Sequence, residues 1–159
     1  MIDDLSPNSG KFNATATDPF GRAFRPPPGD VSAAPRHPRV LVVDDDRKTA
    51  DSLAQLLSLM GYEAFAAYSG AEAIEQLATV KPGCIFLDIA MPVLNGYQTC
   101  LRLREQPDGK HIVIAAVTAW NRRTDRQQAQ ESGFDHYLTK PVQWAAMEAV
   151  IANVTVNDS

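Results

Sequence analysis

Short apolar runs alternate with helix-length amphipathic segments five times after residue 38, and this alternation restricts the fold more than any other feature of the chain. The runs, such as VLVV and CIFL, consist almost wholly of apolar residues. Strands of this kind are buried on both faces, as in a parallel sheet with helices on each side. Alternating strands and helices with right-handed crossovers give a doubly wound α/β fold. The sequence predicts five parallel strands, at 40–43, 62–67, 84–87, 112–117 and 136–139, and five helices, at 47–60, 70–80, 96–105, 122–132 and 142–153.

Residues 1–38 do not share this pattern. Seven of the eleven prolines fall within them, and neither helical nor strand periodicity is visible there. A segment with so little periodic apolar content does not bury enough surface to offset the entropy lost on ordering. We therefore predict a flexible proline-rich leader over 1–38, a single domain over 39–153 and a short tail over 154–159.

Charge and cysteine content exclude several classes of protein. The net charge is −4 at pH 7, and residues 1–38 carry four basic and four acidic residues, so the negative excess lies in the domain. A mildly acidic domain repels a phosphate backbone, so we expect no direct nucleic-acid binding. No apolar run is long enough for a membrane span, and the amino terminus lacks the features of a secretory signal. Cys84 and Cys100 are isolated, which is typical of reduced thiols in a cytoplasmic protein.

Polar and charged residues follow the predicted strands at their carboxyl ends. Ligands of an open parallel sheet bind at this edge, at the point where the strand order reverses. Any one of these residues has an ordinary explanation as a helix cap, a turn residue or a solvated side chain. Their common placement at one edge instead indicates a site, and the residues are Asp44 and Asp45 after the first strand, Asp88 after the third, Thr118 at the end of the fourth and Lys140 after the fifth.

This combination of side chains suits phosphoryl transfer. Crowded carboxylates raise one another's pKa unless a cation neutralises them, and oxygen ligands without His or Cys favour a hard ion such as Mg²⁺. Lys140 would offset the remaining charge, and the Thr118 hydroxyl would donate to a phosphoryl oxygen. A carboxylate can act as the nucleophile, and positioning with electrostatic stabilisation supplies most of the catalysis. We predict that Asp88, on the central strand, is the nucleophile and that Asp46 only caps the first helix.

The segments that carry these residues closely resemble the receiver domains of bacterial two-component response regulators. They read RVLVVDDDRKTADSL, CIFLDIAMPVLNGYQT, IAAVTAW and FDHYLTKPV, and the resemblance covers about residues 38–153. It implies a flavodoxin-like sheet with strand order 2-1-3-4-5 and a phosphoacceptor at Asp88. It also implies a Mg²⁺ site formed by Asp45, Asp88 and the backbone carbonyl of Ala90, with Asp44 acting mainly through water.

The same resemblance assigns the remaining site residues. Thr118 and Lys140 complete the phosphoryl site, and Tyr137 acts with Thr118 as the switch. The Lys140–Pro141 peptide bond is expected to be cis. Ala90 and Trp120 border the site at positions that vary among receivers, so they are expected to influence how long the phosphoryl group persists.

The resemblance implies a signalling role rather than an enzymatic one. A histidine kinase or a histidine phosphotransfer protein would donate the phosphoryl group, and only self-phosphorylation and autodephosphorylation would be intrinsic to the chain. A downstream protein would bind the face formed by residues 122–132, 136–139 and 142–153. Because the chain ends about six residues after the last predicted helix, we expect either a stand-alone receiver or one cut from a hybrid kinase.

Three other functions share parts of this pattern. A haloacid-dehalogenase-type phosphatase needs a second acid two positions after its nucleophile, where this chain has Ala90. A flavodoxin-like FMN carrier would have a Ser/Thr/Gly-rich loop after its first strand instead of Asp44, Asp45 and Asp46. A pseudo-receiver that binds partners without phosphorylation would be expected to lack Asp88 or Lys140.

Overall fold

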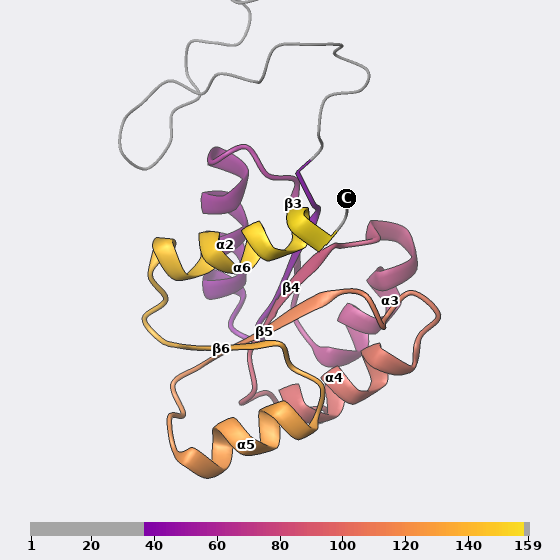
Figure 1. Cartoon of the computed structure of the whole chain (residues 1–159), viewed down its shortest axis with the longest axis vertical. Helices are drawn as coiled ribbons and strands as arrows, with labels where there is room; N and C mark the ends of the chain where they lie inside the picture. The colour runs from indigo at the N-terminus through magenta and orange to yellow at the C-terminus, as the bar shows by residue number, and fades with distance from the viewer. Residues whose placement is uncertain (1–36, 158–159) are drawn as a thin grey trace, which may run out of the picture.

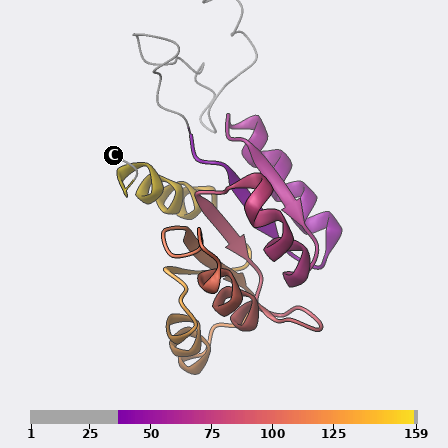
Figure 2. The same ribbon diagram turned by 90° about the vertical axis from the view of Figure 1, so that its right-hand side faces the viewer.

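The computed structural model describes residues 37–157, which form one parallel sheet with helices on both faces (Figures 1 and 2). The strand order β3-β2-β4-β5-β6 is the 2-1-3-4-5 order in chain sequence, and every neighbouring pair is parallel. The predicted fold class and strand order are therefore confirmed. The strands are β2 (Val40–Val43), β3 (Ala64–Ala67), β4 (Cys84–Leu87), β5 (Val113–Thr118) and β6 (His136–Thr139). The helices are α2 (Arg47–Leu59), α3 (Gly70–Val80), α4 (Gly96–Glu105), α5 (Arg123–Glu131) and α6 (Trp144–Asn157).

The end of the chain differs from the prediction. The last helix was expected over 142–153, but α6 runs from Trp144 to Asn157, so residues 154–157 belong to a helix and not to a tail. Val154 explains the extension, because its side chain is buried in the core beneath the sheet. At the other end Pro38 is already buried. The predicted leader otherwise lies outside the described residues, and no helix among residues 37–157 is long and apolar enough to cross a membrane.

Side chains that alternate along each strand build two separate cores. On one face of the sheet they pack against α3, α4 and α5, and on the other face against α2 and α6 (Figure 1). This follows from strand geometry, since successive side chains point to opposite faces. It also explains why the inner strands β2 and β4 read as uninterrupted apolar runs. The two sets along β2 and β4 are Leu41, Val43, Ile85 and Leu87 on the first face, and Val40, Val42, Cys84 and Phe86 on the second.

Two glycines end helices in the way their sequence position indicates. Gly61 follows α2 with φ 101°, and Gly133 follows α5 with φ 103°. This left-handed backbone region is open to glycine because it lacks a Cβ atom. The sequence predicted helix ends at residues 60 and 132, and α2 and α5 end at Leu59 and Glu131, within one residue of them.

The start of α2 fixes the acidic triplet at the edge of the sheet. Asp46 is the N-cap: its side chain accepts hydrogen bonds from the Lys48 amide at 3.2 Å and the Thr49 hydroxyl at 2.9 Å. The Thr49 hydrogen bond is the main reason that the pKa of Asp46 lies below its ordinary value. Asp46 is therefore used by the helix, as predicted, which leaves Asp44 and Asp45 between the strand and the helix.

The loop between β4 and α4 is folded tightly against the end of β4. The Gly96 amide donates to the Ile89 carbonyl at 2.8 Å, and a Cβ atom at Gly96 would lie 2.5 Å from the Asp88 carbonyl oxygen. No larger residue fits at Gly96 without moving the backbone of Asp88. Within the same loop Val93 has φ 67° and a side chain that is 97% exposed. A β-branched residue in this region is strained.

Relief of this strain should stabilise the domain. The left-handed conformation costs a non-glycine residue about 1–2 kcal/mol, and Asn tolerates it better than Val. We expect Val93→Asn to raise the free energy of unfolding by about 1 kcal/mol, measured by urea denaturation. Leu59→Asn removes an exposed apolar side chain from a helix and is the control, because it should bring no such gain. Equal effects of the two substitutions would contradict the prediction.

Candidate functional site

Three carboxylates converge at the carboxyl ends of β2 and β4. Asp44 and Asp45 follow β2, Asp88 follows β4, and the final residues of the two strands, Val43 and Leu87, are register partners. One carboxylate oxygen of each acid lies within 4.8 Å of the others. Asp44 and Asp88 are 3% and 6% exposed, whereas Asp45 is open to solvent. The predicted convergence of the three acids is confirmed.

Lys140 reaches this cluster from the other side. Its Nζ atom lies 3.0 Å from Asp44 Oδ2 and 3.7 Å from Asp88 Oδ2. The amine thus contacts both acids and is nearer to Asp44. Burial lowers the pKa of Lys140, but the Asp44 hydrogen bond and the charges of Asp88 and Asp44 outweigh it, so the pKa lies above its ordinary value. The Lys140–Pro141 bond is cis, as expected.

The carboxyl group of Asp88 has a perturbed pKa. Its pKa is raised from 3.8 to about 6, chiefly by burial and next by the charge of Asp44. Lys140 and the Ala90 amide, which donates a hydrogen bond to Asp88, act in the opposite direction. One ammonium therefore does not compensate the three acids, and a further cation in the cluster would favour the ionised form of Asp88.

The other two acids differ in how their oxygens are used. Asp44 Oδ1 accepts a hydrogen bond from the Asp46 amide at 2.9 Å, and Asp44 Oδ2 accepts one from Lys140. Asp45 accepts no hydrogen bond from any residue in the range 37–157. Asp45 thus has free oxygens that face solvent beside the buried oxygens of Asp88. This difference suits a direct ligand at Asp45 and an indirect role for Asp44.

Thr118 and Tyr137 meet through the backbone of Trp120. Thr118 ends β5 and is fully buried, and its hydroxyl accepts a hydrogen bond from the Trp120 amide at 3.2 Å. The Tyr137 hydroxyl donates to the Trp120 carbonyl at 2.6 Å. The sequence singled out both side chains but gave no sign of this link, because it runs through main-chain atoms that carry no residue-type signal.

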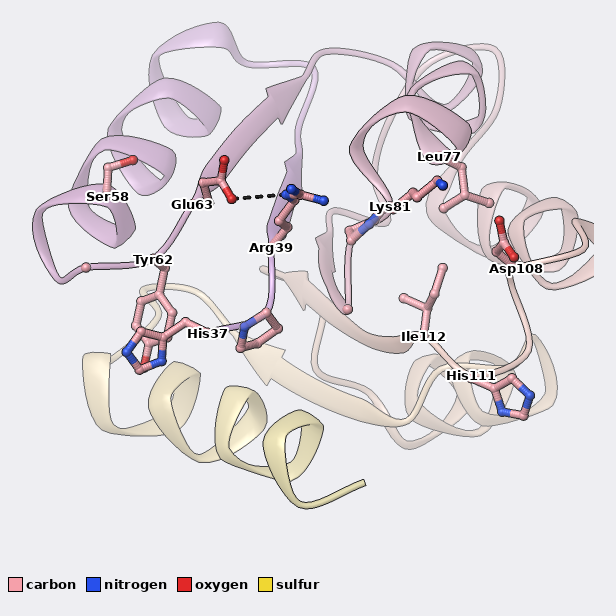
Figure 3. Close-up of a pocket in the computed structure, with 14 residues that line it drawn as sticks. His37, Arg39, Ser58, Tyr62, Glu63, Leu77, Lys81, Asp108, His111 and Ile112 are labelled. Atoms are coloured by element: carbon pink, nitrogen blue, oxygen red, sulfur yellow. Dashed lines mark hydrogen bonds and ion pairs between the residues drawn. The ribbon is translucent and has the colours of Figure 1, made fainter. Parts of the chain in front are cut away.

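A hollow lies at the opposite end of the sheet, where the strands begin. It has a volume of about 750 Å³ and is lined by residues before β2, β4 and β5, including Arg39, Lys81 and Ile112 (Figure 3). An ion pair of 3.0 Å between Arg39 and Glu63 lies within it. None of the acids at the carboxyl ends of the strands contributes to its lining. The site is thus a cluster of charges at the other edge and is separate from this hollow.

The raised pKa of Asp88 predicts a pH-dependent cost to stability. Because the folded chain holds the proton more tightly than the unfolded chain, ionisation destabilises the fold. The cost grows between about pH 4 and pH 6 and is fully present at pH 8. With 1.36 kcal/mol for each pH unit, its upper limit is about 3 kcal/mol.

We therefore expect Asp88→Asn to be 1–3 kcal/mol more stable than the wild type at pH 8, on the order of that limit. The gain should vanish near pH 4. Urea denaturation at both pH values in a chelating buffer measures it. Asp108→Asn, which changes an exposed acid at the opposite edge, is the control. A gain for Asp88→Asn that persists unchanged at pH 4 would contradict the electrostatic explanation.

Comparison with known proteins agrees with this geometry. Residues 40–152 match the family model of the response regulator receiver domain. The chain is 38% identical over 116 residues to response regulator MprA of Mycobacterium ulcerans (strain Agy99), which covers 73% of this chain and 48% of that protein. The chain thus spans about half the length of the curated relatives that it matches.

Solved structures show the same fold. Chemotaxis protein CheY4 of Vibrio cholerae has a TM-score of 0.69 at 26% identity, covering 74% of this chain and 98% of that one. The receiver domain of sensor histidine kinase PA1611 from Pseudomonas aeruginosa PAO1, solved with a magnesium ion in its active-site cleft, has a TM-score of 0.68 at 25% identity, covering 75% and 98%. The family match includes all five strands and the acids at their ends, and the chain therefore belongs to the response regulator receiver domains of two-component signalling.

Proposed function

We propose that Asp88 is the phosphoacceptor of this receiver domain and that its phosphorylation switches the binding of a partner protein. The observation that supports this proposal most is the convergence of Asp44, Asp45 and Asp88 with the Lys140 ammonium at one edge of the sheet. With a pKa of about 6, Asp88 is mostly ionised at neutral pH and is competent as a nucleophile.

The chemical step is a displacement at phosphorus. A carboxylate oxygen of Asp88 forms a bond to phosphorus while the bond from phosphorus to the donor breaks, and the electron pair leaves with the donor atom. For a phosphohistidine donor that atom is a ring nitrogen. The Lys140 ammonium offsets charge on the transferred group, and the buried Thr118 hydroxyl is assigned to donate to one of its oxygens.

The donor atoms of the cluster fit Mg²⁺. They are all oxygen, and Asp45 has free oxygens beside the buried Asp88. We assign Asp45, Asp88 and the Ala90 backbone carbonyl as ligands, and Asp44 as a residue that acts through water. When bound, the ion would neutralise negative charge on the carboxylates and on the phosphoryl oxygens. The other polar contacts to the phosphoryl group are assigned to Lys140 and Thr118.

We further propose a histidine kinase or a histidine phosphotransfer protein as the donor, and a downstream protein that binds the α5–β6–α6 face. The acidic domain disfavours a direct nucleic-acid contact. Two buried free cysteines suit the reducing conditions of the cytoplasm. Self-phosphorylation from small donors and autodephosphorylation are the only reactions we assign to the chain. A phosphatase is disfavoured because Ala90 stands where its general acid would be.

Labelling by acetyl phosphate in Mg²⁺ tests the assignment of the acceptor. Asp88→Asn keeps the shape of the side chain but removes the attacking charge, so labelling should vanish while the fold is retained. Asp45→Asn should instead weaken Mg²⁺ binding, measured by calorimetry, at least tenfold, or about 1.4 kcal/mol, because a ligand charge is lost. Asp108→Asn should leave both properties unchanged.

Each outcome of this experiment separates the competing functions. A labelled adduct that accumulates supports a receiver, phosphate release without an accumulating adduct indicates a phosphatase, and the absence of any reaction indicates a binding module that works without phosphorylation. Full labelling of Asp88→Asn would place the acceptor at another residue.

The lifetime of the adduct should depend on Trp120. Its backbone is fixed beside Thr118, and its side chain is 40% exposed. Hydrolysis needs a water in line with phosphorus, and a bulky indole excludes water whereas Ala90 offers no group to orient it. We expect Trp120→Glu to shorten the half-life of the adduct several-fold; a tenfold change corresponds to about 1.4 kcal/mol of barrier. The measurement is the decay of phosphorylated protein in Mg²⁺ after the donor is removed. Equal or slower decay of the variant would mean that the indole does not shield the site.

A further inference from the structure

Arg126 on α5 is held at two points, by the Asn121 side chain and by the ring of Tyr137. Its Nε and Nη2 atoms donate to Asn121 Oδ1 at 3.1 and 2.8 Å, and its guanidinium carbon lies 4.7 Å from the centre of the Tyr137 ring. The side chain of Arg123, one turn earlier, makes no hydrogen bond or ion pair with residues 37–157. An exposed arginine ordinarily pays an entropic cost to be held in one geometry. The double contact of Arg126 joins α5 both to the β5–α5 loop, through Asn121, and to β6, through Tyr137.

These contacts close a ring around the β5–α5 loop. The Trp120 amide donates to the Thr118 hydroxyl, and the Tyr137 hydroxyl donates to the Trp120 carbonyl. Asn121 follows Trp120 in the chain, and Arg126 joins Asn121 to the face of Tyr137. The ring thus ties α5 and β6 to the buried hydroxyl assigned to the phosphoryl group.

We propose that Arg126 is a positioning residue of the switch, which stabilises the unphosphorylated arrangement of Trp120 and Tyr137. The inference rests on the proposed function. When a phosphoryl group at Asp88 draws the Thr118 hydroxyl toward it, the hydrogen bond from the Trp120 amide to that hydroxyl changes. The resulting shift of Trp120 also changes the hydrogen bond from the Tyr137 hydroxyl to the Trp120 carbonyl. Contacts that hold the loop in its present place oppose that change, so Arg126 lowers the affinity of the site for a phosphoryl group. A contact made in only one of two states shifts the equilibrium by its own free energy.

Beryllofluoride, which binds an aspartate carboxylate reversibly as a phosphoryl analogue, gives an equilibrium measure of this effect. In the full chain with Mg²⁺, Arg126→Ala should bind it three- to fivefold more tightly than the wild type, or about 0.7–1 kcal/mol. Asn121→Ala removes the acceptor of the Arg126 fork and should act in the same direction. Arg126→Lys keeps the charge but loses the fork, so its affinity should be intermediate. Trp120 fluorescence, recorded in a Trp144→Phe background, follows the titration.

Two arginine controls separate positioning from general destabilisation. Arg123→Ala removes a charge from the same helix without touching the ring, and Arg39→Ala breaks an ion pair at the far edge of the sheet. Neither should tighten binding. Unchanged or weaker binding by both Arg126→Ala and Asn121→Ala would overturn the inference while leaving the proposed function intact. If the wild type neither binds beryllofluoride nor accepts a phosphoryl group from acetyl phosphate, the proposed function fails and the inference with it.

Discussion

The register between β2 and β4 forces like charges together. Val43 and Leu87 are partners in neighbouring parallel strands, so the residues that follow them, Asp44 and Asp88, emerge side by side at the same edge. Both side chains are buried, and burial together with this proximity raises the pKa of Asp88 to about 6. The apolar strands that stabilise the sheet thereby hold buried negative charges close together, and the rest of the site has to neutralise them.

Lys140, from a late part of the chain, neutralises part of this negative charge. It follows β6, and because β6 runs parallel to β5 and β4, its loop lies at the same end of the sheet as the two buried acids, which the ammonium contacts. One positive charge among three carboxylates leaves the cluster negative. The remaining negative charge favours binding of a hard cation, which would also contact the oxygens of a phosphoryl group. This is the chemistry we propose.

The same edge connects the charge cluster to the surface of the domain. Thr118 is buried at the end of β5, Tyr137 is half-buried on β6, and the Trp120 peptide unit joins them through two hydrogen bonds. Arg126 extends this connection to α5. Once the Thr118 hydroxyl donates to a phosphoryl group at Asp88, as we propose, these contacts link that group to α5 and β6. These contacts are polar, and polar groups can exchange one partner for another. The side chains of the packed core cannot rearrange in this way.

The sequence alone determined the fold class, the strand order by resemblance, and the identity of Asp44, Asp45, Asp88 and Lys140 as a group. It did so because uninterrupted apolar runs specify buried parallel strands, and because strand ends meet at one edge. Tertiary structure decided the rest. Lys140 lies nearer to Asp44 than to Asp88, α6 continues to Asn157 because Val154 finds a place in the core, and Arg126 is fixed by Asn121 and Tyr137. These outcomes depend on distances between residues far apart in the chain, or on main-chain atoms, and neither leaves a trace in the order of residue types.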